Sequence, residues 1–224
     1  MNQIITDNRH KIDTACQLCF HALEKYNKAV DGFNNQRQQI TASPYIQQEK
    51  ERRINQEEEK LVRSVAGYYE EIRHNLDVIR DAAVEMEDLL DIGQEFQNAL
   101  SVVKTLGKAM PSETRISLVE GFKGQRQALI ILKAAFEDVG ISSEPYFKGL
   151  ILNASKEVDA LDEMAYRLNS QPGKNVLVAV SFASSLEKFA EALGVKLAKR
   201  FADLVDTTGA VNQRMRAVMG LSND

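Results

Sequence analysis

The chain has 224 residues, a net charge of −4 and no tryptophan, and 27% of its residues are charged. Aromatic residues make up only 7%, which argues against a binding surface built from large aromatic side chains. Four prolines and twelve glycines are too few for a fold of many short strands and turns, so the composition favours helices.

The N-terminal residues contain no apolar stretch of the kind that a secretory signal requires. The longest apolar run, 176–180, is much shorter than a membrane span. The two cysteines are three residues apart on an expected helix, which is a poor placement for a structural disulfide. We therefore expect a cytoplasmic protein, in the host cytoplasm or the virion if a phage encodes it.

The first expected helix runs from about Asp7 to beyond Phe33 and frays through the polar residues 34–39. The spacing of 3.5 residues between its apolar positions places them in one stripe, which packs against a partner helix by knobs-into-holes contacts. This pattern predicts helix-on-helix packing, within one chain or between copies. The stripe consists of Ile12, Cys16, Cys19, Leu23, Tyr26, Val30 and Phe33.

The second expected helix begins at Ser43-Pro44, with serine as the cap and proline in the first turn. Helically spaced apolar residues then continue, so the helix reaches about Leu106 if it is unbroken, and the sequence leaves open a break at Gly67 or Gly93. Gly67 and Gly93 are the expected places for a bend, because glycine weakens a helix interior by about 1 kcal/mol relative to alanine. Residues 47–60 contain a single large apolar side chain and are expected to project into solvent.

After a break at residues 106–112, the second half of the chain also follows helical spacing. Residues 176–182 are rich in β-branched side chains, as strands are, but their continuation is helical, so we interpret the whole segment as one helix. The expected helices cover residues 111–139 with Gly140 as the cap, 144–169, 176–204, and a short segment ending near 221. The helix over 144–169 carries a second stripe: Phe147, Ile151, Ala154, Val158, Leu161, Ala165 and Leu168.

The predicted fold class is all-α, with an elongated antiparallel coiled-coil arm over residues 1–106 and a helical bundle over residues 107–224. The first helix is much shorter than the predicted second one, so part of the long apolar stripe needs another cover. An uncovered stripe of that length exceeds what soluble monomers usually expose. We therefore expect self-association through four seam residues: Leu76, Ile79, Met86 and Leu90.

Two short patterns have the spacing of metal ligands. Cys16-x-x-Cys19 matches half of a zinc site, but a second cysteine pair is missing and both residues occupy the apolar stripe. Glu71-x-x-His74 has the spacing found in di-iron bundles, but it lies beside the apolar stripe and no matching motif completes it. We therefore expect no metal and no other cofactor.

Glycine-rich fragments at residues 121–124 and 172–174 resemble parts of a phosphate-binding loop, but neither has the full spacing or a preceding strand. We interpret both as turn or packing glycines. With only three histidines, and both cysteines in a core stripe, candidates for acid–base or nucleophilic catalysis are scarce. The protein is therefore not expected to be an enzyme.

Charge is unevenly distributed. Segment 70–95 has nine acidic residues and two arginines, whereas segment 188–216 has six basic residues and three acidic ones. The two segments are either solvated helix faces or complementary surfaces of two copies. Five residues form the possible basic contact patch: Lys196, Lys199, Arg200, Arg214 and Arg216.

These features favour a non-enzymatic structural or assembly protein that forms homo-oligomers and binds protein partners. In its charge layout and helicity the chain resembles helical scaffolding and accessory proteins of bacteriophage heads. The acidic balance argues against nucleic-acid binding. Two alternatives remain open: a membrane-active helical protein that uses the apolar and basic faces of residues 176–204, and a regulatory protein-binding module.

Overall fold

The computed structural model describes residues 3–89, 93–174 and 176–221. Helices make up 79% of the chain and these residues contain no strand, so the predicted all-α class is confirmed. The elements, in chain order, are α1 (Gln3–Ala42), α2 (Gln47–Asp88), α3 (Gln94–Leu106), the 3-10 turn η1 (Gly107–Ala109), α4 (Ser112–Glu120), α5 (Arg126–Asp138), α6 (Glu144–Phe147), α7 (Ala154–Ser170), α8 (Val176–Ala192), η2 (Phe201–Asp203) and α9 (Ala210–Val218).

Two compact units make up the fold, and each combines three separate stretches of sequence. Unit 1 contains the residues up to Thr14, Val78–Val158 and Lys188–Lys196. Unit 2 contains Ala15–Asp77, Asp159–Glu187 and the residues from Leu197 onward.

This division differs from the predicted one at residue 106, because α2 packs against second-half segments in both units. In unit 1, the Glu87 carboxylate accepts a hydrogen bond from the Ala154 backbone N–H at 2.9 Å. In unit 2, the Tyr69 hydroxyl donates to the Asp162 carboxylate at 3.3 Å.

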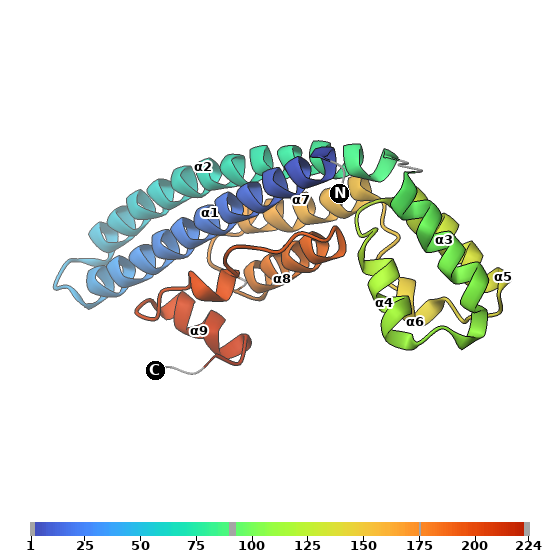
Figure 1. Ribbon diagram of the computed structural model, residues 1–224. Coiled ribbons are helices and arrows are strands. Elements are labelled where there is room, and N and C mark those ends of the chain that lie inside the picture. Colours follow the sequence, from blue (N-terminus) through green and yellow to red (C-terminus); the bar gives the residue numbers. More distant parts are fainter. Residues whose placement is uncertain (1–2, 90–92, 175, 222–224) are drawn as a thin grey trace. The chain divides into compact units, whose positions relative to one another are not determined.

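In unit 2, α1 and α2 run side by side as an antiparallel helical hairpin (Figure 1). The apolar stripe of α1 faces inward as predicted, and its members from Ile12 to Val30 are at most 5% exposed, whereas Phe33 is half-buried. The Cys19 thiol donates to the Ile72 carbonyl at 3.8 Å, and Lys25 pairs with Glu71 at 2.9 Å on the surface.

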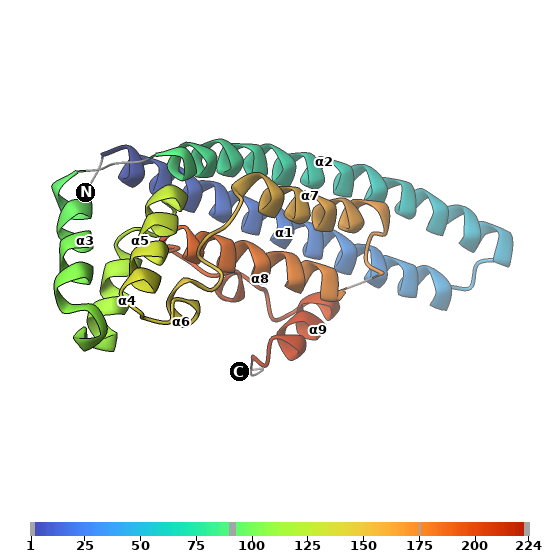
Figure 2. The ribbon, with the colours of Figure 1, turned by 90° about the vertical axis from the view of Figure 1, so that its right-hand side faces the viewer.

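Helices α7 and α8 complete the packing of unit 2 (Figure 2). The predicted stripe over 147–168 is buried except for Ile151, which is half-buried; its members up to Val158 belong to unit 1 and those from Leu161 onward to unit 2. The turn between α7 and α8 is fixed to α1, because the Gly173 backbone N–H donates to the Tyr26 hydroxyl at 2.9 Å. Aromatic rings of α2 and α7 meet edge to face, with the centroids of Tyr69 and Tyr166 6.1 Å apart.

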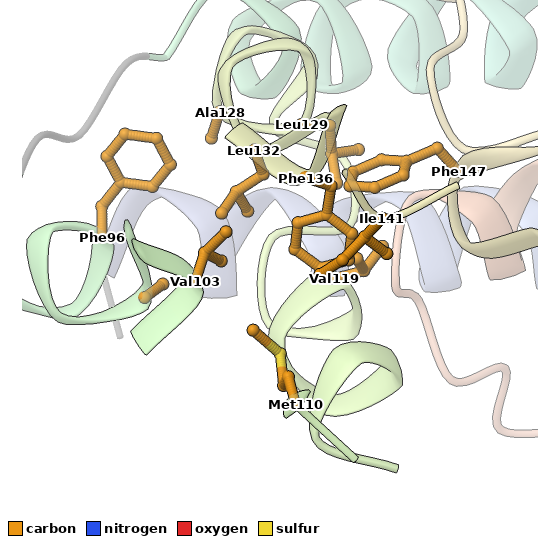
Figure 3. Close-up of a cluster of buried hydrophobic side chains, with 11 residues drawn as sticks. Phe96, Val103, Met110, Val119, Ala128, Leu129, Leu132, Phe136, Ile141 and Phe147 are labelled. Carbon is orange, nitrogen blue, oxygen red and sulfur yellow. The ribbon is translucent and has the colours of Figure 1, made fainter. Parts of the chain in front are cut away.

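Unit 1 has a separate apolar core, shown in Figure 3, that is built from short helices. Helix α3 packs against α5, and α4 packs against α6. Phe136 of α5 lies at the centre of an aromatic group, with its ring 5.3 Å from that of Phe147 and 6.0 Å from that of Tyr146. Ile130 and Ile131 of the same helix are more than a third exposed, so α5 is buried on one side rather than all round.

The first half of the chain differs from the prediction at two helix ends. Helix α1 continues through the polar residues to Ala42, and α2 begins at Gln47 rather than at Ser43. The Ser43 hydroxyl instead donates to the Ile40 carbonyl at 2.6 Å and closes the end of α1. The long helix is also interrupted near Gly93, which caps α3, whereas Gly67 stays inside α2.

In the second half, the predicted helix over 111–139 is two helices, α4 and α5. Their turn contains Gly124 at φ +85°, where a Cβ atom would lie 2.5 Å from the Met86 Cε and 2.9 Å from the Leu193 carbonyl oxygen. A side chain at this position would therefore be both strained and crowded. The predicted helix over 144–169 is likewise divided, into α6 and α7. The predicted cap at Gly140 is confirmed, because its backbone N–H donates to the Glu137 carbonyl at 2.9 Å.

The predicted helix over 176–204 ends early, at Ala192. Gly194 has φ +73°, and its backbone N–H donates to the Glu191 carbonyl at 2.9 Å. The Val195 backbone N–H donates to the Ala190 carbonyl at 2.9 Å, which completes the two-bond pattern typical of a glycine-terminated helix.

Candidate functional site

Helix α9 is held against α1 in unit 2 by buried polar side chains. The Asp31 carboxylate accepts a hydrogen bond at 2.5 Å from the Val211 backbone N–H, in the first turn of α9. A carboxylate at this position also interacts favourably with the helix dipole. One turn before Asp31, the Asn27 side-chain amide donates to the Met215 sulfur at 3.6 Å. These two contacts fix α9 beside the C-terminal half of α1.

This docking creates a groove of about 510 Å³ in unit 2, which we call the basic groove. The volume lies within the range of about 300–1,000 Å³ that is typical of ligand sites. One wall comes from the polar end of α1 and another from the start of α9, and Gly173 of the turn between α7 and α8 also lines the groove. The lining residues are Asn34, Arg37, Gln38, Thr41, Ala42, Gly173, Ala210, Val211 and Arg214.

The electrostatics of the basic groove are set by Arg37 and Arg214. Both side chains are exposed, and neither has an ion-pair or hydrogen-bond partner among the described residues. The lining includes no acidic residue, while Asn34, Gln38 and Thr41 add polar groups. A guanidinium group presents several N–H donors in one plane, which matches the geometry of a carboxylate or a phosphate. The groove is therefore suited to an anionic ligand.

The basic contact patch predicted from sequence is distributed over both units. Arg214 lines the basic groove, and Arg216 is half-buried on the same helix. Lys199 and Arg200 are exposed in unit 2, where the Lys199 carbonyl accepts a hydrogen bond from the Gln17 side chain at 2.8 Å. Lys196 is exposed in unit 1.

Sequence reasoning missed Arg37, the second arginine of the groove. The polar stretch around it was expected to fray, but it forms the last turns of α1. One signal was present in the sequence: between Asp31 and Glu49, Arg37 is the only charged residue. A cation without a nearby carboxylate on the same helix has no local ion-pair partner.

The predicted self-association seam is covered by the chain itself. Leu76, Ile79 and Met86 are each at most 1% exposed, and Leu90 lies outside the described residues. A seam between copies was expected because the apolar stripe on α2 lacked a cover. These three side chains are already covered within one chain, so they give no reason for two copies to associate. Contact between copies would have to use other surfaces.

The acidic segment contains both paired and unpaired carboxylates. Glu71 pairs with Lys25, Glu85 accepts a hydrogen bond from Asn8 at 2.9 Å, and Glu87 lies 3.4 Å from Arg126. Four further acids on α2 are exposed and have no ion-pair or hydrogen-bond partner among the described residues. We call them the acidic stripe, which is defined along the continuous helix α2 alone: Glu70 and Asp77 of unit 2, and Asp81 and Asp88 of unit 1.

The residues with metal-ligand spacing lie either in the apolar core or on the exposed surface of a helix. Cys16 and Cys19 are free and fully buried, and burial raises the pKa of the Cys19 thiol to about 12. Glu71 and His74 are exposed on the surface of α2. Within the described ranges, no group of three or more His, Cys, Asp or Glu side chains is arranged to hold a metal ion.

The two glycine-rich fragments are turns. Residues 121–124 connect α4 to α5, and residues 172–174 connect α7 to α8, where Gly173 lines the basic groove. Helix α8, which carries the apolar face considered for membrane binding, has 17 residues. None of the helices in the described part of the chain is long and apolar enough to cross a membrane.

Comparison with protein-family models, with curated proteins and with solved structures finds no match to this chain, so its function has to be inferred from the geometry described above.

Proposed function

We propose that this protein is a non-enzymatic assembly protein that binds an acidic protein segment in the basic groove. One observation carries the proposal: Arg37 of α1 and Arg214 of α9, which are far apart in sequence, line one groove without a carboxylate to neutralise them. Two like charges that line one groove repel each other, and a bound anion relieves this repulsion.

An acidic protein segment fits this site better than a nucleic acid or a membrane does. The whole chain has a net charge of −4, so the long phosphate backbone of a nucleic acid would meet repulsion outside the groove. A lipid bilayer presents a broad surface, whereas the two arginines line a concave site. A short carboxylate-bearing segment incurs neither penalty.

The non-enzymatic part of the proposal is supported by the positions of the reactive residues. Both cysteines are buried in the core of α1, and the raised pKa of the Cys19 thiol keeps it protonated at neutral pH. All three histidines, His10, His21 and His74, are exposed on helix surfaces, and none lines the basic groove.

The biological setting that we propose is a scaffolding or accessory role of the kind found in bacteriophage heads. Exposed charge pairs contribute about 0.2–1 kcal/mol each, so two arginines give weak and reversible binding. Reversible contacts suit a protein that guides assembly and is then released. Co-sedimentation of the protein with assembling particles, and its absence from finished ones, would support this setting.

The binding proposal is tested by fluorescence anisotropy with a labelled ten-residue glutamate peptide. We expect binding that weakens in 1 M salt, where charges are screened within about 3 Å. The variant Arg37→Gln/Arg214→Gln should lose this binding. The control Arg63→Gln/Arg167→Gln, which removes the same charge from exposed helix positions in unit 2, should retain it.

Equal binding by the groove variant and the control would contradict the proposal, as would the absence of binding to the peptide. The same titration with a single-stranded oligonucleotide and with phosphatidylserine vesicles tests the other anions. If either binds more tightly than the peptide and needs Arg37 and Arg214, the groove serves that ligand instead.

A further inference from the structure

We infer that the acidic segment bound in the basic groove is the acidic stripe on α2 of a second copy of this chain. This inference rests on the proposed function of the groove and names its partner. It replaces the apolar seam expected from the sequence with a charged contact between two different surfaces of the protein.

The acidic stripe is well placed for such a contact. Its members follow steps of 7, 4 and 7 residues along one continuous helix, so they lie within about 20° of a single line. The buried residues Ile72, Ile79 and Met86 lie on the opposite side of α2. The stripe is therefore the outermost line of the helix, and its carboxylates form no ion pair or hydrogen bond with the described residues.

The stripe also presents two neighbouring carboxylates to a site that is lined by two cations. Asp77 and Asp81 are one turn apart, so their carboxylates project from the same side of α2 about 6 Å apart along the axis. The basic groove offers Arg37 and Arg214 from two different helices, together with amide and hydroxyl groups. A convex helix face with two neighbouring carboxylates thus complements a concave site lined by two arginines.

The chain does not satisfy these charges internally. Neither arginine of the groove and none of the four stripe carboxylates forms an ion pair in the described part of the chain. Complementary unpaired charges on two separate surfaces of one molecule favour association between copies. Because the two surfaces differ, one contact leaves the pair with one free groove and one free stripe. Association then continues by adding further copies, or it stops when the free groove binds the free stripe and closes a ring, of which the smallest is a reciprocal dimer.

Two neutralised variants of the full chain test this directly by sedimentation velocity at low salt. The groove variant is Arg37→Gln/Arg214→Gln, and the stripe variant is Asp77→Asn/Asp81→Asn/Asp88→Asn. The matched control for the stripe is Glu113→Gln/Asp138→Asn/Glu144→Gln, which removes the same charge from exposed positions in unit 1. Circular dichroism confirms that every variant keeps its helical content.

We expect the wild type and the control to show sedimentation coefficients that rise with protein concentration and fall again in 1 M salt. Neither variant should assemble on its own, so its sedimentation coefficient should not rise with protein concentration. An equimolar mixture should form a one-to-one pair and stop there, because the intact stripe of one variant binds the intact groove of the other. Assembly of either variant alone to the wild-type extent, or a mixture that does not pair, would overturn the inference.

Failure of this inference is distinguishable from failure of the proposed function. If the wild type does not associate at any concentration but its groove binds the glutamate peptide, the groove takes an acidic segment of another protein. The self-association inference is then wrong and the proposed function stands. If the groove binds no acidic peptide and the wild type does not associate, both are wrong.

Discussion

The carboxylate of Asp31 and the backbone N–H of Val211 are joined by a hydrogen bond of 2.5 Å, which links the middle of α1 to the first turn of α9. The second carboxylate oxygen of Asp31 is buried against Gly209. The position of α9, and with it one wall of the basic groove, therefore depends on a close approach between a carboxylate and a glycine.

Replacing Gly209 by alanine should detach α9. The new Cβ atom would overlap the Asp31 carboxylate, so either the carboxylate or the helix start must move. We expect a loss of about 1–3 kcal/mol of local stability, the usual effect of overpacking. Hydrogen exchange of the α9 amides measures it. Gly67→Ala is the control, because its Cβ meets no atom within 4 Å and should stabilise α2 by about 1 kcal/mol. Unchanged exchange in Gly209→Ala would contradict the described docking.

Replacing Arg9 by lysine should destabilise unit 1. The Arg9 guanidinium donates from Nη2 to the Lys123 carbonyl at 2.8 Å and from Nε to the Leu193 carbonyl at 3.2 Å. A lysine ammonium is a point charge and cannot reproduce this geometry, so at least one carbonyl loses its partner. We expect about 1–3 kcal/mol less unfolding free energy in urea. The exposed substitution Arg73→Lys should have almost no effect. Equal stabilities of the two variants would show that the Arg9 contacts are not maintained.

Replacing Leu161 by aspartate should lower the unfolding free energy by several kcal/mol, because it places an unpaired carboxylate in the buried stripe of α7. Leu161 is 2% exposed. The triple substitution Glu57→Gln/Glu58→Gln/Glu59→Gln is the comparison, since Glu58 and Glu59 are exposed on α2 and the half-buried Glu57 loses only a surface ion pair with Lys60. Thermal unfolding of both variants measures the difference. If the glutamate substitutions lowered the unfolding free energy more than Leu161→Asp does, the assignment of Leu161 to the buried face and of the glutamates to the surface would be wrong.

The stability of the protein should fall in alkaline solution through Cys19. Burial raises the pKa of this thiol from the ordinary value of 9.0 to about 12. The folded state therefore holds the proton above pH 9 while the unfolded state releases it. The resulting stability is fully present below about pH 9 and is lost as the pH rises toward 12. Urea unfolding from pH 7 to pH 10.5 should show a smaller decline in Cys19→Ala than in the wild type. If the unfolding free energies of the wild type and of Cys19→Ala fell in parallel with rising pH, the Cys19 thiol would not be buried as described.

The inward faces of the long helices could be predicted from the sequence, because packing imposes a regular period. The stripe from Ile12 to Val30 keeps a spacing of 3.5 residues, and every member is buried. Helix ends in the second half were harder to predict. Leu197, Phe201 and Leu204 continue the helical period past Gly194, yet α8 ends before that glycine because its backbone adopts a positive φ. Periodicity shows which face is apolar but not where the backbone turns.

The basic groove could be predicted only in part, because it is a tertiary feature. Arg214 belongs to a basic segment that is visible in the sequence, whereas Arg37 is a single charge in a polar stretch. The two lie in one site because Asp31 positions α9 against α1. No local pattern relates residue 37 to residue 214. The cover of Leu76, Ile79 and Met86 was missed for the same reason, since it depends on how distant segments pack.

The interleaving of the two units has a consequence for the synthesis of the protein. Unit 1 requires residues near the N-terminus, a central stretch and Lys188–Lys196, and unit 2 requires the residues from Leu197 onward. A ribosome that has released the first 150 residues has therefore completed neither unit, and the exposed apolar faces of α1 and α2 must wait for the rest of the chain. Contacts between such distant segments slow folding, because a long loop has to close before they form. Fragments cut at residue 106 would each lack parts of both units, so neither half should fold as the full chain does.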